Sequence, residues 1–238
     1  MKKTELLNFI NRYYLNGAVN SVKWKTSDNG CTIEFISDDQ NVIGTLTSDS
    51  IDLGTSELGV YATPLLTKML SAVSDDVDVD VNKVGDKAVS LAISDGEVKM
   101  TFMLADLSII RQVPELKNMP DWNVTIPITD DFRNKFIKAK NAIPDADNFG
   151  VHINAGTAEL VINYSTINNN RIKFNIDADD AIDMGMTCFS ASLLKEMMMA
   201  NKDATQAKLE VSAAGLARAT FTGSDYECTY FLVQLQVS

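Results

Sequence analysis

The chain has 238 residues, of which 45% are hydrophobic and 22% are charged. This length and composition predict one large β domain or two compact domains with a real hydrophobic core, and exclude a disordered, collagen-like or disulfide-stapled protein. The 32 acidic residues outnumber the 21 basic ones, giving a formal net charge of −11. That balance excludes a uniformly basic nucleic-acid coat but leaves room for a local basic surface.

Residues of the usual catalytic and redox types are few. His152 is the only histidine, which excludes two-histidine metal sites and longer histidine relays. The three cysteines, Cys31, Cys188 and Cys228, are widely spaced and predict reduced thiols. No apolar run is long enough to span a membrane, and the first residues are too polar for a signal peptide. We therefore expect a cytoplasmic protein without a membrane partner.

The first half of the chain begins with an amphipathic helix over about residues 2–14. An alternating strand follows at 31–36, and a short helix over 64–73 begins at a Thr-Pro pair. Strands at 77–81 and 97–104 close this half. The apolar row that we expect the short helix to bury consists of Leu65, Met69 and Ala72.

The second half has the same order of elements. A helix over 129–142 begins at Thr129, whose hydroxyl we expect to cap it, and ends before Pro144. A short helix over 191–202 follows the first strands. Its expected buried row consists of Leu193, Met197 and Ala200. The strands expected around these helices are 159–164, 171–176, 208–213, 217–222 and 227–236.

A nearly constant offset relates the two halves. Leu65-Leu66-x-x-Met69 is repeated 128 residues later, and Gly85, Ser94-Asp95 and Glu97 recur at an offset of 130. A duplicated unit explains this better than two unrelated helix–strand segments, the alternative reading. We predict an α+β fold with helices on one face of antiparallel sheets, in two domains over 1–106 and 124–238. Residues 107–123, with two prolines and little periodicity, are the expected interdomain connector.

The positive charge is concentrated in the four expected helices. They hold ten basic and four acidic residues, although the whole chain is strongly acidic. Solvated helix faces are the alternative explanation, but four basic helices in an acidic protein favour a surface that faces phosphates. The candidate DNA-binding residues are Arg12, Lys68, Arg133, Lys135, Lys138, Lys140, Lys195 and Lys202. The helix over 64–73 carries Lys68 alone, so the first domain is expected to hold DNA less strongly.

This layout and several short motifs resemble the DNA sliding clamps, most closely those of large tailed bacteriophages and more distantly proliferating cell nuclear antigen. The motifs lie mainly in the last 50 residues and are individually weak. They are residues 189–194, 207–211, 217–223 and 230–235, together with Leu6-Leu7-Asn8-Phe9 in the first helix.

The resemblance implies a non-enzymatic processivity factor. Three copies would close head to tail into a ring of six similar domains, with the helices around double-stranded DNA and the sheets outside. Such a clamp tethers the replicative DNA polymerase, is opened by an ATP-driven clamp loader, and works in the host cytoplasm if it is phage-encoded. The expected pocket for partner peptides lies at the start of the connector and consists of Leu107, Ile109, Ile110 and Val113.

Two acidic segments contain residue types that could hold a metal ion. Asp76, Asp78, Asp80 and Asn82 have the spacing of calcium-loop ligands, but Val81 and Lys87 stand where that loop needs Gly and Glu. The other segment contains Asp177, Asp179, Asp180 and Asp183. We expect a surface strand and an acidic loop, and no metal or cofactor. The alternatives that remain are a β-rich structural virion protein and, less favoured, a metal-dependent nuclease.

Overall fold

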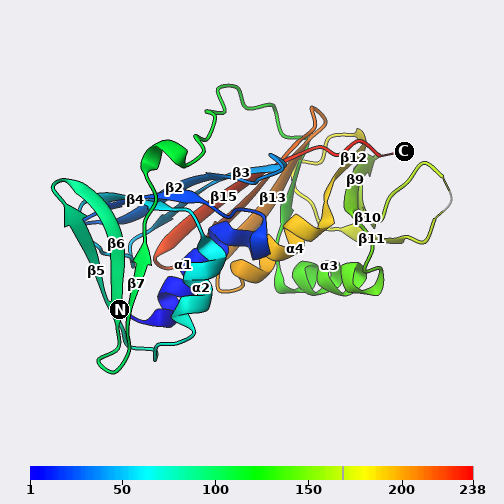
Figure 1. Ribbon diagram of the computed structural model, residues 1–238. Helices are drawn as coiled ribbons and strands as arrows, with labels where there is room; N and C mark the ends of the chain where they lie inside the picture. Colours follow the sequence, from blue (N-terminus) through cyan, green and yellow to red (C-terminus); the bar gives the residue numbers. More distant parts are fainter. Residues whose placement is uncertain (168, 238) are drawn as a thin grey trace. The chain divides into compact units, whose positions relative to one another are not determined.

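The computed structural model describes residues 1–167 and 169–237 and has two compact units. The first comprises Met1–Pro114 with Asp225–Cys228, and the second comprises Glu115–Ser224 with Thr229–Ser238. Each consists of helices and antiparallel strands, so the α+β prediction is confirmed (Figure 1). The division at residue 114 lies inside the expected connector, whereas the domain ranges themselves stay a prediction. No helix in the described residues is long and apolar enough to cross a membrane.

The first unit contains two groups of paired strands and two helices that contact each other. The strands run in the order β4-β1-β2-β3 and, separately, β5-β6-β7. The elements are α1 (Lys3–Tyr14), η1 (Leu15–Gly17), β1 (Val22–Ser27), β2 (Gly30–Ile36), β3 (Val42–Ser48), β4 (Ser56–Val60), α2 (Thr63–Leu70), β5 (Asp78–Val84), β6 (Lys87–Ser94), β7 (Lys99–Met103) and η2 (Leu107–Ile109).

The second unit repeats this plan, which confirms the predicted duplication. Its strands run in the order β11-β10-β9-β12 and β15-β14-β13-β8, and α3 contacts α4. The elements are β8 (Val124–Pro127), α3 (Asp130–Ala142), β9 (Asn148–Asn154), β10 (Thr157–Ile162), β11 (Ile172–Ile176), β12 (Met184–Ser190), α4 (Ala191–Ala200), β13 (Gln206–Ser212), β14 (Leu216–Thr222) and β15 (Tyr226–Val233). The predicted strands do not include β1, β3, β4, β6, β8, β9 and β12.

The positions of the helices follow from their capping residues and from their rows of buried apolar side chains. The Thr129 hydroxyl accepts a hydrogen bond from the Phe132 amide at 3.1 Å and so caps α3, as predicted. In α1, Phe9 and Tyr13 are buried and make edge-to-face contacts with Trp24 on β1, with ring centroids 5.2 and 6.4 Å apart. The apolar face of α1 is therefore held against its own sheet.

The expected buried row of α2 is wrong. Leu65 is 52% exposed and Ala72 is exposed, while Leu66 and Leu70 are completely buried. Adjacent rows of this helix have the same apolar spacing, so periodicity alone does not select one of them. The buried Thr63 hydroxyl lies 3.3 Å from the Tyr13 hydroxyl, which fixes the rotation of the helix. In α4 the expectation holds for Met197, which is completely buried, but Leu193 and Ala200 are only half-buried.

We expect Gly30→Ala to lower the free energy of unfolding by about 2–4 kcal/mol. Gly30 has φ of +118°, and a Cβ there would overlap the Ser48 carbonyl and lie 2.8 Å from the Cα of Asp49. Gly85→Ala is the matched control, because Gly85 has φ of +62° with nothing within 4 Å of its Cβ position. Its cost should be only about 1 kcal/mol. Urea denaturation of both variants measures the difference, and equal costs would contradict it.

The buried Glu210 carboxylate on β13 makes the stability of the fold depend on pH. Burial alone would raise the pKa of Glu210, but hydrogen bonds from Arg218 at 2.7 Å and Lys208 at 3.2 Å outweigh it and lower the pKa below 4.5. The ionised form therefore contributes stability that is present above pH 4.5 and is lost as the pH falls through the lowered pKa.

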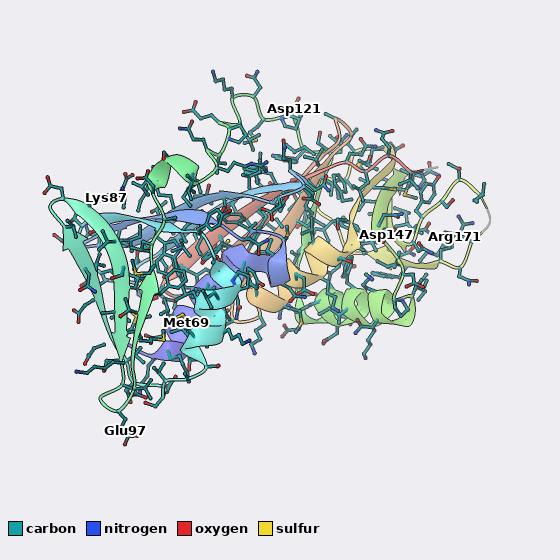
Figure 2. All side chains as sticks on the ribbon, in the orientation of Figure 1. Met69, Lys87, Glu97, Asp121, Asp147 and Arg171 are labelled. Atoms are coloured by element: carbon teal, nitrogen blue, oxygen red, sulfur yellow. The ribbon has the colours of Figure 1, made fainter. Side chains whose placement is uncertain are left out.

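Denaturation at several pH values between about 3 and 7 checks this, with Glu210→Gln removing part of the acid-side fall in stability. Glu97→Gln, at an exposed hairpin tip, is the control and should leave that fall unchanged (Figure 2). An identical pH profile for Glu210→Gln and the wild type would contradict the assignment.

Candidate nucleic-acid interface

Four of the eight predicted DNA-binding residues have side chains that are free to meet phosphates. Within the part of the chain that the structure describes, these four form no ion pair with an acidic residue; they are Lys68, Lys138, Lys195 and Lys202. Lys195 is half-buried and the other three are exposed. In the second unit, Asn134 and Asn141 are exposed one turn to either side of Lys138 on α3. Of the predicted DNA-binding residues, the second unit therefore presents three lysines without an ion pair to a described residue, and the first unit presents one.

Arg12 and Lys140 do not lie on exposed helix faces, so that expectation is wrong for both. Arg12 is 4% exposed, and its guanidinium carbon lies 3.4 Å from the centre of the Tyr226 ring. Lys140 is 7% exposed, and its ammonium donates to the Pro144 carbonyl at 2.6 Å, at the end of α3. Both long side chains are packed within the unit, and their charged groups interact with groups of that unit rather than with solvent.

Arg133 and Lys135 are partly neutralised by the first turn of their own helix. Arg133 donates to Asp130 at 2.8 Å and to the Lys202 carbonyl at 3.5 Å, and only 14% of its side chain is exposed. Lys135 is exposed and pairs with Asp131 at 2.7 Å, which raises the pKa of the lysine. Arg133 thus links α3 to the end of α4, while Lys135 keeps its charge in solvent.

Three of the four residues expected in the partner pocket lie beside Lys23 and Lys25 of β1 and Glu34 of β2. Leu107, Ile110 and Val113 line a hollow of about 240 Å³ in the first unit. Ile109 is 57% exposed and lies outside this lining. Sequence reasoning missed the charged residues of the hollow, which are Lys23, Lys25, Glu34 and Arg111. The signal for three of them was present, because Lys23 and Lys25 alternate with buried residues of β1, and Glu34 does so on β2.

The acidic segments behave as surface structure. Asp78 and Asp80 lie on β5 with their side chains exposed, and the backbone of Asp179 is hydrogen-bonded to that of Thr125. No group of three or more acidic, histidine or cysteine residues among the described positions could hold a metal ion.

Comparison with known proteins identifies the fold. No family model matches the sequence, and no curated protein matches it either. The structure, however, matches proliferating cellular nuclear antigen from Entamoeba histolytica with a TM-score of 0.73 and 15% identity, covering 99% of this chain and 96% of that one.

Two further structures match over nearly the whole chain. One is A. fulgidus PCNA, solved with the C-terminal region of FEN-1 bound, with a TM-score of 0.76, 15% identity, and coverage of 100% of this chain and 98% of that one. The other is the PCNA2–PCNA3 complex of Sulfolobus tokodaii, with a TM-score of 0.73, 10% identity, and coverage of 98% and 97%. Matches of this extent show that the chain has the PCNA-type clamp fold with two repeated domains.

The burial of Arg12 leads to a stability prediction. We expect Arg12→Ala to lower the free energy of unfolding by about 2 kcal/mol, because it removes a buried side chain stacked on Tyr226. The exposed Lys138→Ala is the control and should change it by less than about 0.5 kcal/mol. Thermal unfolding measures both, and an Arg12→Ala protein as stable as the wild type would show that the stack contributes nothing.

Proposed function

We propose that the protein is a DNA sliding clamp, a non-enzymatic processivity factor that closes as a homotrimeric ring around duplex DNA. The observation that carries the proposal is the full-length match to PCNA structures, at TM-scores of 0.73 to 0.76. Fold alone does not determine function. The charge distribution supports the proposal independently, because unpaired lysines lie on the helices of a protein with a net charge of −11.

The charge pattern suits a protein that holds DNA but has no preferred position along the duplex. Lysine attracts phosphates as a point charge and reads no base sequence, so contacts from Lys138, Lys195 and Lys202 are equivalent at every position along a duplex. The acidic remainder of the chain repels DNA from other surfaces. A ring with these properties retains DNA by encircling it, and the phosphate contacts need only be weak.

Free sheet edges support ring closure. Among the described strands, β7 is an end strand of β5-β6-β7, and β11 is an end strand of β11-β10-β9-β12. Such edges expose unpaired backbone groups that readily pair with another chain. We propose that β7 of one copy pairs with β11 of the next, a head-to-tail contact that closes when three copies are joined. The PCNA2–PCNA3 structure is itself a complex of two clamp chains.

Partner binding is proposed at the hollow beside residues 107–113. In the A. fulgidus structure, a clamp holds the C-terminal region of FEN-1, which is a precedent for a short partner segment on this fold. In this chain the apolar residues Leu107, Ile110 and Val113 offer an anchor for such a segment. We propose that the replicative polymerase and an ATP-driven clamp loader bind at this hollow. We also propose that the protein works in the cytoplasm. The likeness to phage clamps stays a prediction.

Charge reversal on α3 and in the turn that follows α4 tests the proposal, because Lys138 lies on α3 and Lys202 lies two residues beyond α4. We expect the double variant Lys138→Glu/Lys202→Glu to bind duplex DNA at least about tenfold more weakly at low salt. The slope of log affinity against log salt should become shallower by about 0.9 for each phosphate contact that is lost. Fluorescence anisotropy with two unrelated duplex sequences measures both quantities.

The matched control is Lys83→Glu/Lys117→Glu, which makes the same charge change at exposed positions that belong neither to α3 nor to the turn after α4. It should weaken binding far less. Equal losses in the two double variants would mean that net charge, rather than the helix surface, governs DNA binding. Divalent-dependent cleavage of the duplex by the wild type would favour the nuclease instead.

A further inference from the structure

The hollow beside residues 107–113 carries more positive than negative charge, although the chain as a whole is strongly acidic. Its charged lining consists of Lys23, Lys25 and Arg111 against Glu34, while the whole chain has a net charge of −11. These residues lie on β1, on β2 and in the segment after η2, which runs beside the two strands (Figure 1). A local positive charge attracts a ligand of the sign that the rest of the surface repels.

The two lysines of the hollow are already balanced by acidic neighbours. The Lys25 ammonium lies 2.8 Å from the Glu34 carboxylate, and the Lys23 ammonium lies 3.5 Å from the Glu57 carboxylate. All four side chains are at least partly exposed to solvent, so these pairs are weak. The net positive charge of the cluster therefore comes from Arg111.

Arg111 is held in place without being neutralised. Its Nη1 group donates to the main-chain carbonyls of Ser37 and Asp38, each at 3.3 Å. The side chain is exposed and forms no ion pair with a carboxylate among the residues that the structure describes. A guanidinium has further N–H donors on Nε and Nη2, and this pair matches the two oxygens of a carboxylate. That side of Arg111 is left for a ligand.

Apolar side chains lie directly beside this charge. Leu107, Ile110 and Val113 line the same hollow as Arg111, and Ile110 precedes Arg111 in the sequence. The volume of about 240 Å³ is larger than the cavity of about 150 Å³ that holds benzene, so the hollow has room for one large apolar side chain. An occupant that matches both features has an apolar anchor and a carboxylate close to it.

The backbone around the hollow is fixed within the first unit itself. The Ala105 amide donates to the Gly59 carbonyl on β4 at 2.8 Å. The Asp106 carboxylate caps η2 by accepting a hydrogen bond from the Ser108 amide at 3.0 Å, and Ile110 is only 6% exposed. A site that is already held in its binding shape loses little conformational entropy when a ligand binds. The positive charge is therefore presented at a defined place beside the apolar lining.

We propose that this hollow selects partner segments that carry a carboxylate beside their apolar anchor, and that Arg111 binds that carboxylate. The inference rests on the partner site proposed above and specifies its chemistry, since neutral or basic segments with the same anchor bind more weakly. The carboxylate can come from an Asp or Glu side chain or from the C-terminus of the partner. The selection also limits binding elsewhere, because the acidic remainder of the chain repels an acidic segment.

Peptides of matched sequence test the selection on the full-length protein. Three short peptides with blocked ends share a leucine–phenylalanine anchor and differ only in the two residues after it, which are Asp-Asp, Asn-Asn or Lys-Lys. A fourth is the Asn-Asn peptide with a free C-terminal carboxylate, which distinguishes the two sources of the carboxylate. Affinities are measured from the NMR signal of the Ile110 δ-methyl group, which reports binding at the hollow itself.

The wild type should bind the Asp-Asp peptide at least about fivefold more tightly than the Asn-Asn peptide, and the Lys-Lys peptide most weakly. In Arg111→Gln the affinities for the Asp-Asp and Asn-Asn peptides should lie within about twofold of each other, since the remaining lysines are paired and exposed. The affinity for the Asn-Asn peptide should stay near its wild-type value, which shows that the hollow is intact.

Two further substitutions of Arg111 separate its charge from its geometry. Arg111→Lys keeps the charge but loses the paired donors, so it should retain only part of the preference. Arg111→Glu should reverse the order, with the Lys-Lys peptide binding more tightly than the Asp-Asp peptide. The matched control is Lys83→Gln, which removes one positive charge at an exposed position of the same unit outside the hollow. It should keep the full preference. Circular dichroism checks that each variant is folded.

The outcomes separate this inference from the proposed function. If the wild type binds the Asp-Asp and Asn-Asn peptides equally, or if the preference survives in Arg111→Gln, the charge selection is wrong while the partner hollow stands. If no peptide shifts the Ile110 signal at the highest soluble concentration, the partner site fails and the selection fails with it. A single-stranded oligonucleotide that displaces the Asp-Asp peptide more effectively than the unlabelled peptide does would assign the hollow to nucleic acid instead.

Discussion

The burial of one apolar row of each helix against its own unit decides which charges can reach a ligand. In α1 the packing of Phe9 and Tyr13 against Trp24 turns Arg12 inward onto Tyr226. In α3 the burial of Phe136 leaves Lys138 in solvent, while Lys140 folds back onto the end of its helix. The usable positive surface is therefore smaller than the count of basic residues suggests, and it is a consequence of core packing.

This selection is consistent with a protein that holds DNA weakly and lets it move. Strong, well-oriented contacts such as bidentate arginine pairs would favour particular positions on the duplex. Here both helix arginines are engaged within their units, Arg12 on Tyr226 and Arg133 on Asp130 and the Lys202 carbonyl. The residues left free are lysines, whose flexible side chains and hydrated charges give an attraction that varies little along the DNA.

The sequence predicted the duplicated plan, the four helices and the cap at Thr129, because these depend on local spacing and local hydrogen bonds. It missed β9, in which the consecutive residues Asn148 to Val151 are all buried, so that alternation marks only the last residues of the strand. It also chose the wrong buried row of α2, since two adjacent rows are apolar and the Thr63–Tyr13 contact that selects one is long-range. The sequence did not predict that Arg12 points inward, because its partner Tyr226 is likewise distant in the sequence.

The central claim is that three copies of this chain form a closed ring. Light scattering on a size-exclusion column, at two protein concentrations, tests it most directly. A closed ring of three copies has a mass of three times 26.1 kDa, and it should keep that mass on dilution as long as the protein concentration stays well above the one at which the ring dissociates. A particle of 26.1 kDa even at the highest concentration would contradict it, because the lysine-bearing helices would then have no ring to line.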